Sequence, residues 1–219
     1  ARRWTVLPAL CGVLLLGRQV FSWPGLEWLL LAAALTLPLS GVLTYGKPQA
    51  LTFTDVCAMA AAGFAIPWAF SGLYGLRMLE GGYLLVLTPL VAAFCSDALA
   101  LFTGMALGRH KLAPLVSPHK TVEGAAGGLV GGMAGMAIFC LVYRAITGVN
   151  LGLPLCVALG LLGALLGELG DLSFSAVKRQ YGIKDYGRLL PGHGGVLDRF
   201  DSVLFAAPVL CALLRALAA

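Results

Sequence analysis

The chain has 219 residues, of which 59% are hydrophobic and only 11% are charged. Soluble globular domains carry about 25% charged residues, so the composition excludes an ordinary soluble enzyme and indicates an integral membrane protein. The 15 Lys and Arg residues against 10 Asp and Glu give a net charge of +5. This excess is too small to indicate nucleic acid as a partner, and it fits loops that face anionic headgroups or phosphates.

Seven apolar segments remain when the chain is cut at charges and turn residues. Because one membrane span takes about 20 residues, no room is left for a soluble domain of normal size. We predict an all-α fold, a polytopic transmembrane helical bundle that forms a single domain over 1–219. We divide it into N-terminal helices (1–82) and the helices and loops that carry the candidate catalytic residues (83–219). The predicted spans are 4–17, 26–44, 51–71, 83–107, 124–146, 151–177 and 202–218.

The first segment, 4–17, follows two arginines and is short enough to resemble a signal peptide. No small-x-small cleavage site precedes Arg18-Gln19, so we interpret the segment as a short first membrane helix. The absence of an initiator Met leaves open whether the N-terminus has been processed or trimmed.

The positions of the cations predict the orientation. With residue 1 in the cytoplasm and one crossing per segment, only four of the 15 cations fall outside, namely Arg18, Arg77, Arg144 and Arg215. The positive-inside rule favours this arrangement. The two longest polar segments, 108–123 and 178–201, then form two functional loops on the cytoplasmic face.

Cysteines and glycines are better explained by packing than by chemistry. All six cysteines lie in apolar stretches without a Cys-x-x-Cys pair, which argues against zinc and a disulfide framework. Glycines recur every four residues in the fifth span, a spacing that lets another helix approach one face closely. A phosphate-binding glycine loop is the alternative. The two rows are Gly124, Gly128 and Gly132, and Gly127, Gly131 and Gly135.

Carboxylates inside a membrane are costly and tend to be functional. Asp55 lies one turn into its span, close to Lys47, so we expect it to be solvated or to cap the helix. Asp97 lies near the middle of the fourth span, where it must face a polar cavity or a cation. A structural, hydrogen-bonded carboxylate is the alternative for Asp97.

Two pairs of acids suggest a site for a hard cation. Glu168 and Asp171 share one helix face with Ser175, and Asp198 and Asp201 are again three residues apart at the expected first turn of the last helix. Mg²⁺ prefers one or two carboxylates together with phosphates and water. We predict Asp171, Asp198, Asp201 and Glu168 as its ligands, with room for a second cation. The alternative is a solvated basic loop with a helix cap.

Basic and glycine-rich segments near these acids suit phosphate groups. Gly192, Gly194 and Gly195 surround His193 and permit close backbone approach, while neighbouring Lys and Arg side chains can hold phosphate oxygens. On the other polar segment, Ser117, Lys120 and Thr121 precede a helix and form a plausible phosphate clamp. Short sequences of this second kind are common, so the clamp is the weaker signal.

The two polar segments together resemble a known family. Residues 175–201 contain Ser-x-x-Lys-Arg, Lys-Asp-x-Gly, Pro-Gly-His-Gly-Gly and Asp-Arg-x-Asp, and the upstream segment reads Ser117-Pro118-x-Lys120-Thr121-x-Glu123-Gly124. These motifs closely resemble the signature of phosphatidate cytidylyltransferases. The resemblance covers 83–205 well and the first 80 residues by hydropathy only.

The resemblance implies that CTP and phosphatidic acid react to give CDP-diacylglycerol and pyrophosphate, with Mg²⁺, for phospholipid synthesis. It also implies a homodimer in the bacterial inner membrane, with the active site facing the cytoplasm and 83–219 carrying catalysis. Family members are usually somewhat longer at the N-terminus. The chain has Asp97-Ala98-Leu99-Ala100-Leu101 where Asp-Thr/Ser-Gly-Ala-Tyr is expected, and Val122 where Trp often precedes Glu123.

We expect a phosphatidate oxygen to attack the α-phosphorus of CTP, with catalysis by positioning and charge neutralisation. Two rivals stay open: a CTP-dependent transferase for another lipid phosphate, and an ion or proton transporter that uses Asp97, Glu168 and Asp171 as a relay. The catalytic candidates are Asp171, Asp198, Asp201, Lys178, Arg199 and His193. The substrate-binding candidates are Ser117, Lys120, Thr121, Ser175, Arg179, Lys184, Gly194, Gly195 and Asp97.

Overall fold

The computed structural model describes residues 6–20, 26–47, 50–187 and 194–218. The chain divides into two compact units, Ala1–Ser71 and Gly72–Ala219. Helix α4 (Ile66–Arg77) begins in the first unit and ends in the second.

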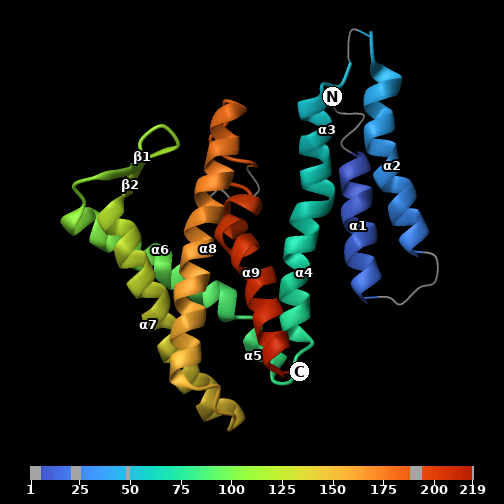
Figure 1. Cartoon of the computed structure of the whole chain (residues 1–219). Coiled ribbons are helices and arrows are strands. Elements are labelled where there is room, and N and C mark those ends of the chain that lie inside the picture. Colours follow the sequence, from blue (N-terminus) through green and yellow to red (C-terminus); the bar gives the residue numbers. More distant parts are fainter. Residues whose placement is uncertain (1–5, 21–25, 48–49, 188–193, 219) are drawn as a thin grey trace. The chain divides into compact units, whose positions relative to one another are not determined.

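Within the described residues, the first unit contains three helices and a π-helical turn, labelled η2, before α4 begins. Its elements are α1 (Val6–Val20), α2 (Leu26–Thr44), α3 (Phe53–Ala60) and η2 (Ala61–Ala65). Helix α1 packs against α2 and η2 around a small core of Cys11, Ala33 and Leu37. These helices lie in the blue to cyan part of the ribbon in Figure 1.

A capping box starts α3. The Asp55 amide donates to Thr52 Oγ1 over 3.2 Å, and the Thr52 amide donates to Asp55 Oδ2 over 2.9 Å. Each side chain thus satisfies one of the amides that a helix start leaves without a partner. The prediction that Asp55 caps its helix is confirmed.

The second unit holds the remaining helices and one antiparallel hairpin. Helix α6 packs on α7, α7 on α8, and α8 on α9, so neighbours in sequence are neighbours in space. In Figure 1 these elements run from green to red. They are α5 (Gly82–Leu85), α6 (Thr88–Leu107), β1 (Lys111–Ala113), β2 (Ser117–Thr121), α7 (Val122–Thr147), α8 (Leu153–Gln180) and α9 (Leu197–Ala218).

The glycines of α7 bring its backbone against both neighbouring helices. A Cβ atom on Gly131 would lie 2.5 Å from the carbonyl oxygen of Cys95 in α6, and one on Gly132 would lie 2.7 Å from the carbonyl oxygen of Gly160 in α8. Any larger residue would force the helices apart, which confirms packing as the role of both glycine rows. Four of the six cysteines, all of which are free, are buried in the helix packing.

Six helices of the described residues are long and apolar enough to cross a membrane, and α1 is a shorter apolar helix. The all-α membrane bundle is thereby confirmed, with one addition: the predicted polar loop 108–123 contains the β1–β2 hairpin. Helix α8 also continues through Lys178 and Arg179 to Gln180, because cations in a last turn are favourable to the helix dipole.

Candidate functional site

The hairpin and the C-terminal end of α8 lie at the same end of the second unit (Figure 1). The guanidinium Nε of Arg179 donates a hydrogen bond of 3.1 Å to the carbonyl oxygen of Val116, between the two strands. This contact joins polar segments that are separated by two membrane-spanning helices. The prediction that both segments share one face is confirmed.

Lys120, the last cation of the hairpin, forms an ion pair with Asp171 of α8. Its Nζ lies 2.5 Å from Asp171 Oδ2, and each side chain is 26% exposed. The other carboxylate oxygen of Asp171 accepts a hydrogen bond of 3.3 Å from Ser175, one turn further along α8. The structure thus brings together Lys120, Asp171 and Ser175, three residues that the sequence had assigned to the site.

A second Lys–Asp pair connects the end of α8 to the start of α9. Lys178 Nζ lies 3.1 Å from Asp198 Oδ1, and the side chains are only 11% and 6% exposed. Asp198 Oδ2 accepts the backbone N–H groups of Tyr186 and Gly195, each over 2.9 Å. Asp198 lies in the first turn of α9, as predicted, and there its charge also favours the helix dipole.

Tyr186 covers the Lys178–Asp198 pair. Its hydroxyl donates to the carbonyl oxygen of Phe174 over 2.9 Å, and its ring meets the Phe174 ring edge to face at 5.8 Å. The ammonium of Lys178 lies 5.5 Å from the Tyr186 ring centre, a cation–π distance. Burial, with the nearby charges of Asp198 and Asp201, raises the pKa of Tyr186 to about 12.

Several carboxylates lie within electrostatic range of one another. Asp171 interacts with Asp97, Glu168 and Asp201, and Lys120 acts on both Asp97 and Glu168. Asp201 is only 6% exposed and accepts the Ser202 amide over 2.9 Å. The site therefore concentrates negative charge inside the span region, where it needs cations to offset it.

Glu168 carries an unsatisfied buried oxygen. Among the residues that the structure describes, neither its Oε1 atom nor the hydroxyl of Ser96 in α6 has a hydrogen-bond partner. The two atoms lie 2.6 and 2.9 Å from where a Cβ of Gly128 would be. Within the described part of the chain, no group of three His, Cys, Asp or Glu side chains is already gathered closely enough to hold a metal ion.

A cavity of about 430 Å³ opens between α6, the hairpin and α7. Asp97 lies on its wall, as the sequence required of a carboxylate in mid-span, together with Glu168 of α8 and Lys120 and Thr121 of the hairpin. Thr121 is also the N-cap of α7, where its hydroxyl accepts the Gly124 amide over 3.0 Å. Most of the remaining wall is apolar.

The other predicted residues lie in the hairpin, in the loop after α8 and in the first turn of α9. Ser117 pairs with Ala113 at the start of β2, Lys184 is exposed in the loop after α8, and Arg199 follows Asp198 in the first turn of α9. Gly194 has a φ of +80°, a left-handed conformation that favours glycine. His193 lies outside the described residues.

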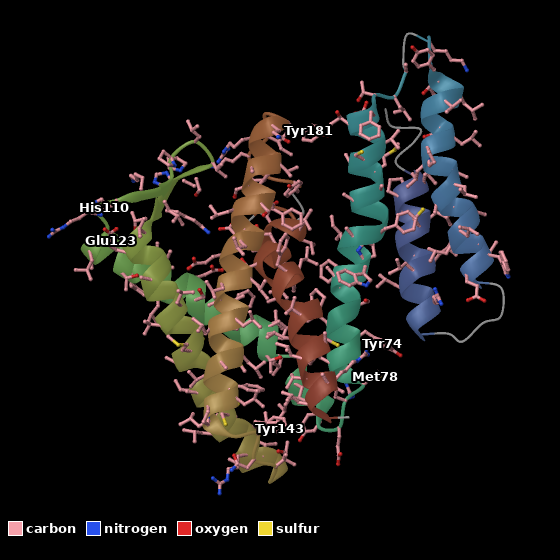
Figure 2. All side chains as sticks on the ribbon, in the orientation of Figure 1. Tyr74, Met78, His110, Glu123, Tyr143 and Tyr181 are labelled. Carbon is pink, nitrogen blue, oxygen red and sulfur yellow. The ribbon has the colours of Figure 1, made fainter. Side chains whose placement is uncertain are left out.

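Sequence reasoning missed Glu123 and His110 as a pair. Glu123 Oε1 lies 2.6 Å from His110 Nδ1, and Glu123 Oε2 accepts the amides of Arg109 and His110 over 3.0 and 3.2 Å. Figure 2 shows the two side chains meeting where the chain enters the hairpin. The signal available was an acid in the first turn of α7 following the Ser-Pro-x-Lys-Thr segment.

Comparison with known proteins gives a consistent picture. The sequence model of the cytidylyltransferase family matches residues 3–217. A phosphatidate cytidylyltransferase of Bacillus subtilis strain 168 is 38% identical over 220 residues, covering 95% of this chain and 78% of the relative. Proteins of the same name from Staphylococcus saprophyticus and Staphylococcus haemolyticus are 40% and 39% identical over 158 residues. In each staphylococcal comparison, the match covers 72% of this chain and 58% of the relative.

Proposed function

The chain belongs to the cytidylyltransferase family, and on that premise we propose that it transfers the cytidylyl group of CTP to phosphatidic acid. An oxygen of the lipid phosphate forms a bond to the α-phosphorus of CTP, the bond from that phosphorus to the β-phosphate breaks, and pyrophosphate leaves. The products are CDP-diacylglycerol and pyrophosphate. The proposal rests on one observation: two Lys–Asp ion pairs, Lys120–Asp171 and Lys178–Asp198, lie at the same end of a membrane bundle.

The lipid phosphate is already anionic at neutral pH, so the reaction needs no strong base in the protein. It does need positive charge, because both reactants are anions and negative charge builds up on the leaving pyrophosphate as the bond breaks. Lys120 and Lys178 are candidates to hold phosphate oxygens, since each now neutralises an aspartate that a cation could take over. Arg179, Lys184 and Arg199 are further candidates near the same end of the helices.

The donor set suits Mg²⁺. Asp171 lies within electrostatic range of three other carboxylates, those of Asp97, Glu168 and Asp201, and this negative charge and the unsatisfied oxygen of Glu168 favour a cation. Mg²⁺ takes one or two carboxylates together with phosphates and water. Asp171 and Asp198 would hold it, with Asp201 and Glu168 in support and room for a second cation. When bound, Mg²⁺ supplies charge neutralisation at the phosphates.

The orientation follows from the distribution of cations. The positive-inside rule favours placing the hairpin and the loop after α8 at the cytoplasmic face of a bacterial inner membrane, where CTP is available. A homodimer is proposed on the resemblance alone, and no nucleic acid is expected as a partner. Membrane lipids surround the helices as their solvent.

The decisive experiment is pyrophosphate release by the purified chain with phosphatidic acid, CTP and Mg²⁺. Release that requires all three supports the proposal, and no release with an intact fold contradicts it. Replacing phosphatidic acid by an isoprenoid ether lipid phosphate separates the nearer rival. Ion flux into proteoliposomes without nucleotide would favour a transporter.

A further inference from the structure

Tyr186 is tied to the helix bundle through its backbone. Its amide donates to Asp198 Oδ2 over 2.9 Å, and the amide of Gly195 donates to the same oxygen over the same distance. The next residue, Gly187, lies so close to Gly195 that a Cβ atom on Gly195 would be 3.0 Å from the Cα atom of Gly187. These contacts hold the backbone of Tyr186 beside the first turn of α9, where Asp198 lies.

The ring of Tyr186 is held by contacts of its own. Its hydroxyl donates to the carbonyl oxygen of Phe174 over 2.9 Å, and the two rings meet edge to face at 5.8 Å. The Phe174 ring in turn meets the ring of Phe205 in α9 edge to face at 6.2 Å. Gly170 leaves room for this row, because a Cβ atom there would lie 3.1 Å from the Phe205 ring. The three rings therefore connect the loop after α8 to both α8 and α9.

The phenol of Tyr186 keeps its proton at neutral pH. Burial, with the nearby charges of Asp198 and Asp201, raises its pKa to about 12. The hydroxyl therefore remains a donor to the Phe174 carbonyl oxygen. The ring also carries no negative charge that would compete with Asp198 for the ammonium of Lys178.

Lys178 is the residue that needs such support. A lysine carries its ammonium on a flexible four-carbon stem, so the charge can point in many directions. The ammonium of Lys178 donates to Asp198 Oδ1 over 3.1 Å, and it lies over the Tyr186 ring at 5.5 Å from the ring centre. The face of an aromatic ring attracts a cation at this distance. Because the Lys178 side chain is only 11% exposed, the carboxylate and the ring together fix the direction of the ammonium.

We propose that Tyr186 is a positioning residue, whose ring holds the ammonium of Lys178 where a phosphate group of the substrate binds. The inference rests on the proposed function, in which Lys178 is a candidate to hold phosphate oxygens. A charge that is already oriented stabilises a transition state better than one that must first turn, because no reorganisation accompanies the reaction. Tyr186 touches no reacting atom in this assignment and acts through Lys178.

Nuclear magnetic resonance tests the positioning without turnover. The full chain in detergent is labelled with ¹³C-lysine, and Lys178→Arg identifies the signal of Lys178 among those of the five lysines. The ring current of Tyr186 should shift the Cε protons of Lys178 upfield. The shift should persist in Tyr186→Phe, which keeps the ring, and vanish in Tyr186→Leu. An unshifted signal in the native chain, or a shift that survives in Tyr186→Leu, would overturn the inference.

Tyr181→Leu is the matched control. Tyr181 is the other tyrosine that follows α8, and its side chain is 48% exposed at the end of that helix (Figure 2). Its replacement should leave both the Lys178 signal and the turnover unchanged. Equal loss of the shift in Tyr181→Leu and Tyr186→Leu would show that the general structure of the loop holds Lys178, against the assignment to the Tyr186 ring.

A double-mutant cycle measures whether Tyr186 acts through Lys178. Tyr186→Leu should lower kcat for pyrophosphate release about tenfold, and Tyr186→Phe should retain most of it. In a chain that already carries Lys178→Met, Tyr186→Leu should cause little further loss, because the group that it positions is gone. All assays are made below the unfolding temperature of each variant. A second full loss in the double variant is what a merely structural residue would give, and it would refute the positioning role.

The two measurements separate this inference from the proposed function. If the Lys178 signal depends on Tyr186 as expected but the native chain releases no pyrophosphate, the positioning stands and the proposed reaction fails. If the native chain releases pyrophosphate and Tyr186→Leu does so at the same rate, the reaction stands and the positioning role fails.

Discussion

Lys178 and Asp198 form a salt bridge of 3.1 Å across 20 residues of sequence, with side chains only 11% and 6% exposed. Breaking such a buried pair by removing one partner costs about 3–5 kcal/mol, because the remaining charge stays buried. Lys178→Met should therefore lower the thermal unfolding temperature markedly, and Lys178→Met/Asp198→Asn should recover part of the loss.

The control for this prediction is the exposed Arg18–Glu27 pair. It has an N–O distance of 3.6 Å, with side chains 57% and 61% exposed, and such pairs contribute about 0–1 kcal/mol. Arg18→Met should leave the unfolding temperature almost unchanged. Similar losses for Arg18→Met and Lys178→Met would mean that burial does not strengthen the inner pair.

Asp171 and Asp198 are predicted to act as a unit in holding Mg²⁺. Asp171→Asn and Asp198→Asn should each eliminate most pyrophosphate release, and the double variant should lose little more, because removing either member already disables a shared site. The measurement is turnover across a Mg²⁺ titration, with unfolding temperature as a check on the fold. Near-normal turnover of either single variant at low Mg²⁺ would contradict a shared site, and multiplicative losses would indicate two separate roles.

Lys120 and Arg199 should matter more for turnover than cations at other positions. A charged hydrogen bond to phosphate is worth about 1.5–3 kcal/mol, so Lys120→Ala and Arg199→Ala should each reduce kcat/KM by about 10- to 150-fold. Arg144→Ala, at the other end of α7 from Lys120, is the matched control. Equal effects of all three substitutions at equal expression would show that only general electrostatics is at work.

Glu123 should stabilise the backbone at residues 109 and 110, where the chain enters the hairpin. It accepts two backbone amides and the His110 ring nitrogen, and Glu123→Ala should remove these bonds and weaken the local backbone structure. The Arg109 and His110 amides should then exchange with deuterium faster, while those in the middle of α8 keep their protection. Unchanged exchange at both amides would mean that the backbone there is stable without Glu123.

Tyr186 should make stability fall in alkali. The pKa of Tyr186 is raised from 10.0 to about 12 in the folded chain. The contribution of its neutral phenol to the free energy of unfolding is therefore complete below pH 10 and is lost as pH rises toward 12. Tyr186→Phe should cost about 1 kcal/mol at neutral pH through the lost hydrogen bond to Phe174, and it should reduce the alkaline loss. Unfolding temperatures of both proteins between pH 8 and about pH 12 measure this difference. Parallel profiles would exclude Tyr186 as the titrating group.

Hydropathy and helix-end chemistry were enough to predict much of the fold. The long apolar segments correspond to helices, Asp198 lies in the first turn of α9 and Asp55 in a capping box. These features depend on residues close together in sequence, which is why hydropathy and helix-end residues predict them. The shared end of the two polar segments followed from counting crossings.

The hairpin and the choice of ion-pair partners could not be read in the same way. Strand β2 contains Pro118 and no alternating apolar pattern, and Glu123 and Arg179 support the hairpin through contacts outside it. The two polar segments offer four lysines and several aspartates lie nearby, but only packing decides that Lys120 meets Asp171 and Lys178 meets Asp198. Such pairing depends on the distance between helices, which local sequence does not encode.

The turn between α7 and α8 lies at the end of these helices that is remote from the hairpin and the loop after α8. Gly148 and Gly152 bound it with φ values of +73° and +84°, and Asn150 is exposed between them. The backbones of α7 and α8 meet far from this turn, at Gly132 and Gly160, so their association does not depend on the covalent connection. We therefore expect a cut at Asn150 to give two complementary fragments, one contributing Lys120 and the other Asp171, and their co-expression should reassemble the ion pair from separate polypeptides.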